Sequence, residues 1–215
     1  MTARFRTPTP NPHELRYLAL GDSYTIGEGV EPDGRWPVQL ARALRNEGVA
    51  LADPHIVAAT GWTTDELSAA IDAAEPLGRF DFASLLIGVN NQYRGRDAAQ
   101  YRDDFSALLD RAIGLANNRA DRVLVLSIPD WGVTPFGAGS GRDVAQIARE
   151  LDAYNAVAKA ECERRGIAFV DITPVSRTRG AEAGMVADDG LHPSAAMYAE
   201  WTARALPVAQ GRLSR

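Results

Sequence analysis

Short apolar runs alternate with amphipathic stretches along the whole chain, and this alternation restricts the fold more than any other feature. The apolar runs have the length and composition of buried strands, and they lie at 17–20, 56–59, 82–87, 123–128 and 168–172. A segment with apolar residues at helical spacing follows each run, at 36–48, 63–74, 97–115, 144–165 and 193–205. Strands that alternate with helices in this way form a parallel sheet with helices on both faces. We therefore predict an α/β fold, a three-layer α/β/α sandwich with a five-stranded parallel sheet.

The two ends of this pattern define the expected domain. Residues 1–14 are polar and carry prolines at positions 8, 10 and 12, so we predict an N-terminal arm followed by a single domain over 15–215. The arm lacks the apolar core of a secretion signal, and no run is long enough to cross a bilayer. A cytoplasmic protein that does not bind membranes is therefore expected, unless a signal has been removed from the chain.

Charge and cysteine content exclude further classes. The net charge of −5 argues against a protein that binds nucleic acid, because such proteins normally carry a basic surface. Cys162 is the single cysteine, so it has no partner for an internal disulfide. Its position within a predicted helix favours a buried apolar thiol over a reactive one.

A serine stands at the end of the first predicted strand. Gly21-Asp22-Ser23 directly follows the run that ends at Leu20. Open α/β sheets bind their ligands at the carboxyl ends of their strands, so Ser23 lies where a reactive hydroxyl would be useful. A serine hydroxyl is a weak nucleophile and needs a base within hydrogen-bond reach.

His192 is the candidate base, because His13 lies in the predicted arm and His55 lies at the opposite edge of the sheet. A neutral imidazole accepts the serine proton and returns it to the leaving group. Asp189 stands three residues earlier, so one turn would bring its carboxylate to the ring. A solvated pair of Asp188 and Asp189 before a helix start explains this spacing equally well. A metal site of these three residues is disfavoured, because it lacks further histidine ligands.

Three blocks resemble the motifs of the GDSL (SGNH) family of serine hydrolases. They are Gly21-Asp22-Ser23, Gly88-Val89-Asn90 and Asp189-Gly190-Leu191-His192, with Gly61 between the first two. Three spaced blocks in the family's order are far more specific than any one of them, although each alone reads as a turn or loop. The resemblance implies a flavodoxin-like SGNH hydrolase fold and hydrolysis of esters. No cofactor and no metal are expected.

The resemblance also implies roles for five residues. Ser23 is the nucleophile, His192 the base and Asp189 the residue that orients the base. The oxyanion donors are the backbone N–H groups of Ser23 and Gly61 and the side-chain amide of Asn90. Fixed donors of this kind stabilise the charge of a tetrahedral intermediate by about 3–4 kcal/mol each.

Two residues depart from the family pattern. Tyr24 follows Ser23 where the family name has leucine, and Asn91 follows Asn90 where aspartate is common. Neither occupies an implied catalytic position, so we expect changes in the pocket and not a loss of catalysis. Asp22, beside the nucleophile, is interpreted as a structural residue that holds the turn.

Candidate substrate-binding residues follow the predicted strand ends. They are Trp62, Asn91, Tyr93 and Trp131. Packing is the main alternative for the two tryptophans, and an exposed loop is the alternative for Tyr93. The glycine-rich segment 130–141 and the polar segment 173–189 are predicted to be loops, and residues 137–141 within the first are interpreted as a mobile loop and a possible lid.

The predicted function is that of a serine esterase acting on a small-molecule acyl ester through an acyl-enzyme. Two alternatives stay open: an acyltransferase with the same triad, in which an alcohol replaces water, and a non-catalytic flavodoxin-like binding module. The sequence does not choose among an acetylated sugar, a lysophospholipid, a thioester and an aryl ester, and it does not indicate the oligomeric state.

Overall fold

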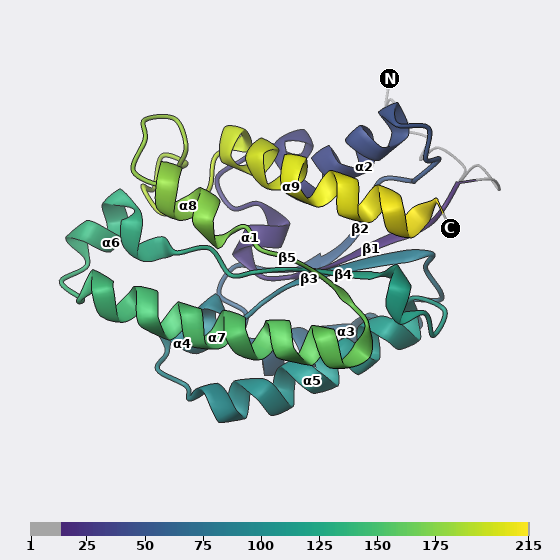
Figure 1. Ribbon diagram of the computed structural model, residues 1–215, viewed down its shortest axis with the longest axis horizontal. Helices are drawn as coiled ribbons and strands as arrows, with labels where there is room; N and C mark the ends of the chain where they lie inside the picture. Colours follow the sequence, from purple (N-terminus) through teal and green to yellow (C-terminus); the bar gives the residue numbers. More distant parts are fainter. Residues whose placement is uncertain (1–13, 215) are drawn as a thin grey trace, which may run out of the picture.

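The computed structural model describes residues 14–214, and its centre is one parallel sheet (Figure 1). The strands are β1 (Tyr17–Gly21), β2 (His55–Ala58), β3 (Phe82–Leu86), β4 (Val123–Leu126) and β5 (Ala168–Val170). They pair in the order β2-β1-β3-β4-β5, and every pair is parallel. This is the flavodoxin-like order, in which the connections run to opposite sides of β1. The predicted five-stranded parallel fold is therefore confirmed.

Helices cover both faces of the sheet (Figure 1). One layer contains α2 (Trp36–Asn46), α8 (Thr173–Arg179) and α9 (Ala195–Leu213). The opposite layer contains α3 (Thr64–Ala74), α5 (Ala98–Leu115) and α7 (Val144–Arg165). Strands β1, β3 and β4 are buried at every residue, whereas the edge strand β2 is partly exposed. Burial on both faces explains why the central strands read as continuous apolar runs.

The long helices begin and end at the signals that the sequence carries. Thr63 and Glu66 form a capping box at the start of α3, in which Glu66 Oε2 accepts the Thr63 N–H at 2.9 Å. Asp97 caps α5 by accepting the N–H groups of the second and third helical residues, each at 2.8 Å. Helix α7 ends at Gly166, whose φ of 70° lies in the left-handed region that favours glycine.

Short helices connect the longer elements at α1 (Ser23–Ile26), η1 (Pro32–Gly34), α4 (Val89–Tyr93) and η2 (Ala120–Arg122). The segment 130–141 was predicted to be a loop, and this prediction was wrong, because it contains η3 (Trp131–Val133) and α6 (Pro135–Gly139). The segment 173–189 likewise begins with α8. Elements this short show no hydrophobic period, so only their caps mark them, as when the Thr134 hydroxyl accepts the Gly137 N–H at 3.1 Å in α6.

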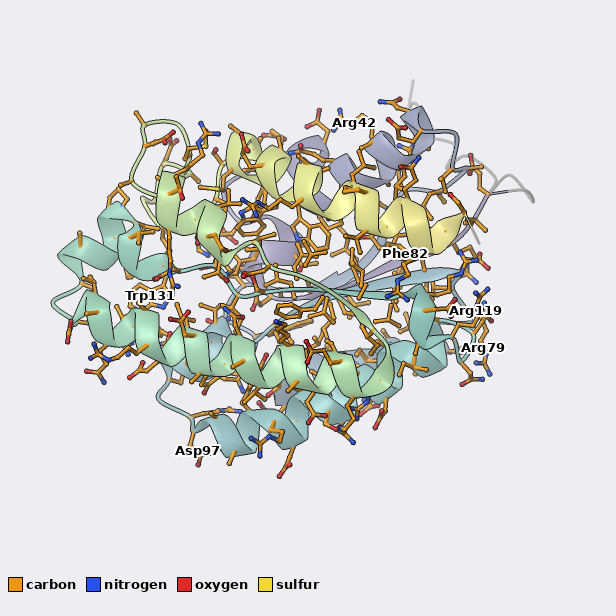
Figure 2. All side chains as sticks on the ribbon, in the orientation of Figure 1. Arg42, Arg79, Phe82, Asp97, Arg119 and Trp131 are labelled. Atoms are coloured by element: carbon orange, nitrogen blue, oxygen red, sulfur yellow. The ribbon has the colours of Figure 1, made fainter. Side chains whose placement is uncertain are left out.

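The core lies between the sheet and both helical layers. In Figure 2, Phe82 lies near the amino ends of the strands and Trp131 near the carboxyl ends. Cys162 is fully buried on α7, and burial raises the pKa of its thiol to about 12, as expected for an unreactive cysteine. Within residues 14–214, none of the helices combines the length and apolar character that crossing a membrane requires. Most of the predicted arm, including His13, lies outside the described residues.

Candidate active site

Loops at the carboxyl edge of the sheet surround a cavity of about 240 Å³. In Figure 1 this edge is the left end of the sheet, where α6, α8 and the loop before α9 gather. The cavity is lined by Ser23, Tyr24, Thr60, Gly61, Val89, Asn90, Tyr93, Trp131, Phe136, Leu191 and His192. A larger hollow of about 510 Å³ lies beside Pro76 and Arg79, away from every candidate residue. The fold thus brings Ser23, Gly61, Asn90 and His192 to one space from distant parts of the chain.

A tight turn places Ser23 at the start of α1. A side chain at Gly21 would lie 2.2 Å from Thr25 Oγ1 and 2.5 Å from the Leu86 carbonyl oxygen, so only glycine fits there. Asp22 is the N-cap of α1, and its Oδ1 accepts the Tyr24 N–H at 3.0 Å. Ser23 is the first residue of the helix, so its own N–H needs no intrahelical acceptor and is free to act as a donor.

Asp22 is a fully buried carboxyl beside the candidate nucleophile. Burial raises its pKa to about 7, although the backbone N–H groups of Tyr24 and Gly88 favour the charged form. Its Oδ2 makes no hydrogen bond among the described residues. These contacts support the structural interpretation of Asp22, because it holds the turn and points away from solvent.

We expect Asp22 to make the free energy of unfolding fall with rising pH between about 4 and 7. The carboxyl has its usual pKa of 3.8 when the chain is unfolded, but burial raises the pKa to about 7 in the folded protein, so the folded state loses stability across this window. This difference corresponds to roughly 4 kcal/mol. Denaturant unfolding of wild type and Asp22→Asn from pH 4 to pH 8 measures this slope. A stability difference between the two proteins that does not change with pH would contradict the prediction.

His192 and Asp189 form a hydrogen-bonded pair in the turn before α9. His192 Nδ1 lies 2.5 Å from Asp189 Oδ2, and Asp189 Oδ1 accepts the N–H groups of Leu191 at 2.8 Å and His192 at 2.9 Å. Partial burial raises the pKa of Asp189, but these hydrogen bonds outweigh it and keep the pKa below its usual value. A charged carboxylate at Nδ1 keeps the proton on that nitrogen, which leaves Nε2 as the acceptor.

Tyr24 packs against the imidazole of His192. Its ring lies edge-on to the ring of His192, with centroids 5.9 Å apart, and edge-on to the ring of Trp201 at 6.0 Å. The described residues show no hydrogen bond between the Ser23 hydroxyl and His192, although both line the cavity. Catalytic hydrogen bonds often tighten only when substrate binds. The departure from the family pattern at position 24 is the sequence signal for this contact; it predicted a change in the pocket but not the packing of Tyr24 against His192.

The two further oxyanion candidates lie on the loop after β2 and on the short helix α4. Gly61 has a φ of 86°, in the left-handed region that favours glycine, and it lines the cavity. Asn90 lies in α4, and its Nδ2 donates to the Trp62 carbonyl at 2.9 Å. An amide nitrogen carries two hydrogens, so one N–H of Asn90 remains beyond this bond.

The four candidate substrate-binding residues divide into two pairs. Tyr93, 51% exposed, and Trp131 line the cavity with their rings 5.5 Å apart. Trp62 lies outside the lining, and Asn91 is fully buried with its amide bonded to Thr64. The cavity is also lined by three apolar residues that were not predicted from the sequence: Val89, Phe136 and Leu191. They carry no local signal, because only the fold brings their segments to the cavity.

Comparison with known proteins assigns the class. The model of the GDSL-like lipase/acylhydrolase family matches residues 19–200, and the chain therefore belongs to this family. A catalytic triad and an oxyanion hole are typical of the family. Comparison with curated proteins gave no match.

Solved structures with the same fold have low sequence identity to this chain. A lipase/acylhydrolase from Enterococcus faecalis is 20% identical, with 92% of this chain and 97% of that chain covered and a TM-score of 0.69. The psychrotrophic esterase EstA from Pseudoalteromonas sp. is 14% identical, with 94% and 100% covered and a TM-score of 0.70. The lipase Lip_vut3 from a goat rumen metagenome is 20% identical, with 93% and 99% covered and a TM-score of 0.72. At these identities the likeness shows the fold alone.

Proposed function

We propose that this hydrolase is a serine esterase that cleaves carboxylic esters through an acyl-enzyme. The observation that carries the proposal is the single cavity shared by Ser23 and by His192, whose ring is bonded to Asp189. A nucleophile, a base and a group that orients the base are the parts that activated-serine chemistry requires. Membership of the lipase/acylhydrolase family supports the same reaction class.

The proposed reaction follows from the contacts. Ser23 Oγ attacks the ester carbonyl while His192 Nε2 accepts its proton, and Asp189 stabilises the resulting imidazolium. The N–H groups of Ser23 and Gly61 and the amide of Asn90 stabilise the oxyanion. His192 then protonates the departing alcohol, and a water molecule, deprotonated by the same nitrogen, hydrolyses the acyl-enzyme.

The cavity walls favour a small ester with an apolar group. Apart from the proposed catalytic groups and Thr60, the lining is apolar or aromatic, and Tyr93 and Phe136 are among the most exposed large hydrophobic residues described. A volume of about 240 Å³ falls below the about 300–1,000 Å³ typical of pockets for drug-sized ligands. A screen of p-nitrophenyl esters tests this size, and turnover that rises steadily from acetate to octanoate would contradict it.

A fluorophosphonate probe tests the enzyme proposal directly. We expect it to label the folded wild-type protein on Ser23, because only an activated serine attacks phosphorus at a useful rate. The structure of EstA inhibited by monoethylphosphonate supports this choice of reagent. Mass spectrometry of the labelled peptide locates the adduct. Ser23→Ala should remain unlabelled, and absence of labelling in the wild type would favour a binding module.

A further inference from the structure

Hydrogen bonds from α4 and its C-terminal residue hold the loop that contains Gly61. We call residues 60–64 the Gly61 loop. Four bonds tie it to this helix: Asn90 Nδ2 to the Trp62 carbonyl at 2.9 Å, Arg94 Nη2 to the Gly61 carbonyl at 2.7 Å, Asn91 Nδ2 to Thr64 Oγ1 at 2.7 Å, and Thr64 N to Asn91 Oδ1 at 3.1 Å. On the other side, the Thr60 hydroxyl donates to the carboxylate of Glu28. The loop is therefore held by polar contacts at consecutive residues.

The hydrogen bonds of Thr64, at the end of the Gly61 loop, explain why position 91 carries an amide. The Thr64 hydroxyl donates to Asp104 Oδ2 at 3.0 Å, so it can only accept from Asn91, and Asn91 Nδ2 supplies that donor. A carboxylate at position 91 would place two acceptors against each other in a fully buried site. Asn91, at a position where the family commonly has aspartate, therefore donates a hydrogen bond to the Gly61 loop that a carboxylate could not donate.

Hydrogen bonds hold the peptide that joins Gly61 to Trp62. A Cβ built on Gly61 would meet no atom within 4 Å, and glycine has the widest backbone freedom of any residue. Arg94 donates to the Gly61 carbonyl at 2.7 Å, and the Trp62 N–H makes a longer bond to the Ala59 carbonyl at 3.4 Å. Arg94 is held in its turn by Glu66, with 3.3 Å between Arg94 Nη2 and Glu66 Oε2, and Glu66 belongs to the capping box of α3.

We propose that Arg94 is a positioning residue that sets the orientation of Gly61 as an oxyanion donor. This inference rests on the proposed function. An oxyanion donor acts only when its N–H is aimed at the place where charge develops, to within about 0.5 Å. Arg94 touches no reacting atom, and it acts by fixing the carbonyl of the residue whose N–H is the donor. A guanidinium is suited to this task, because its planar fork binds the Gly61 carbonyl and the Glu66 carboxylate together.

Steady-state kinetics of Arg94→Ala with p-nitrophenyl acetate test the inference. We expect kcat to fall about 10- to 100-fold and KM to change less than about threefold. The loss of kcat should not exceed the effect of removing a donor outright, which is about 10²–10³-fold. Arg94→Lys should recover part of kcat, because its ammonium can still donate to the Gly61 carbonyl. Affinity for a trifluoromethyl ketone, which forms an oxyanion with the serine, should fall by the same factor as kcat/KM.

Arg96→Ala is the matched control. Arg96 lies two residues further along and pairs with Asp65 of α3, as Arg94 pairs with Glu66, but it does not contact Gly61. We expect this variant to keep kcat within about twofold. Both ion pairs are partly exposed, so neither variant should lose much stability, and thermal unfolding checks this. If Arg94→Ala fails to fold, the Arg94→Lys kinetics replace it.

The outcomes separate the two proposals. If the wild type is active, two results would overturn the role of Arg94 and leave the esterase proposal intact. One is an unchanged kcat in Arg94→Ala, and the other is an equal loss of kcat in Arg94→Ala and Arg96→Ala. A wild type that neither turns over esters nor reacts with the fluorophosphonate would overturn both. A loss confined to Arg94→Ala, with the analogue affinity falling in parallel, supports the inference.

Discussion

Replacing His192 with alanine is expected to lower kcat for p-nitrophenyl acetate by about 10⁴- to 10⁶-fold while the fold persists. The ring is the one imidazole that lines the cavity with Ser23, so its removal leaves the hydroxyl without a base. Among the described residues, the side chain of His192 makes one hydrogen bond, to Asp189, and the backbone bonds that shape the turn remain in the variant. Initial rates, together with circular dichroism and the melting temperature, measure the effect.

His55→Ala is the control for this variant. His55 begins β2 at the other edge of the sheet, where its ring packs against Phe80 with centroids 6.0 Å apart. We expect this variant to keep nearly the full rate. A His192→Ala protein that also keeps a near wild-type rate would show that the base is another group.

Asp189→Asn is expected to lower kcat by about 10⁴-fold at neutral pH. The amide keeps an oxygen that can accept the N–H groups of Leu191 and His192, so the turn should survive. What it loses is the negative charge beside His192 Nδ1, which holds the tautomer and stabilises the imidazolium. Because hydrogen bonds keep the pKa of Asp189 below its usual value, the wild-type carboxylate is charged at neutral pH, so its protonation should not limit activity there.

Asp188→Asn separates this effect from a general loss of charge in the loop. Asp188 is the neighbouring exposed carboxylate, and removing its charge should change kcat by less than about threefold. A pH profile of kcat/KM for the three proteins completes the comparison. Equal rates in Asp189→Asn and wild type would mean that the short Nδ1 contact plays no part in turnover.

Features governed by neighbouring residues could be predicted from the sequence. The alternation of strands and helices follows from local hydrophobic periods, and the capping box at Thr63 and the cap at Asp97 follow from side chains that reach only two or three residues. The pair of Asp189 and His192 belongs to the same class, because three residues form one turn. Interactions of this kind join residues that are close in the sequence, so they can be predicted without the tertiary structure.

Contacts between distant residues could not be derived in this way. Motif order suggested that Ser23 and His192 meet, but only the order of the strands brings their loops to one edge, across a separation of most of the chain. Burial of Asn91 against Thr64 and the bond from Arg94 to Gly61 left no local signal, because each joins segments about thirty residues apart. A side chain's partners across such distances depend on how whole layers pack, and no hydrophobic period or capping motif encodes them. The chain's own pattern therefore specified the architecture and the candidate catalytic residues, whereas packing selected the walls of the cavity and the residues that contact its proposed donors.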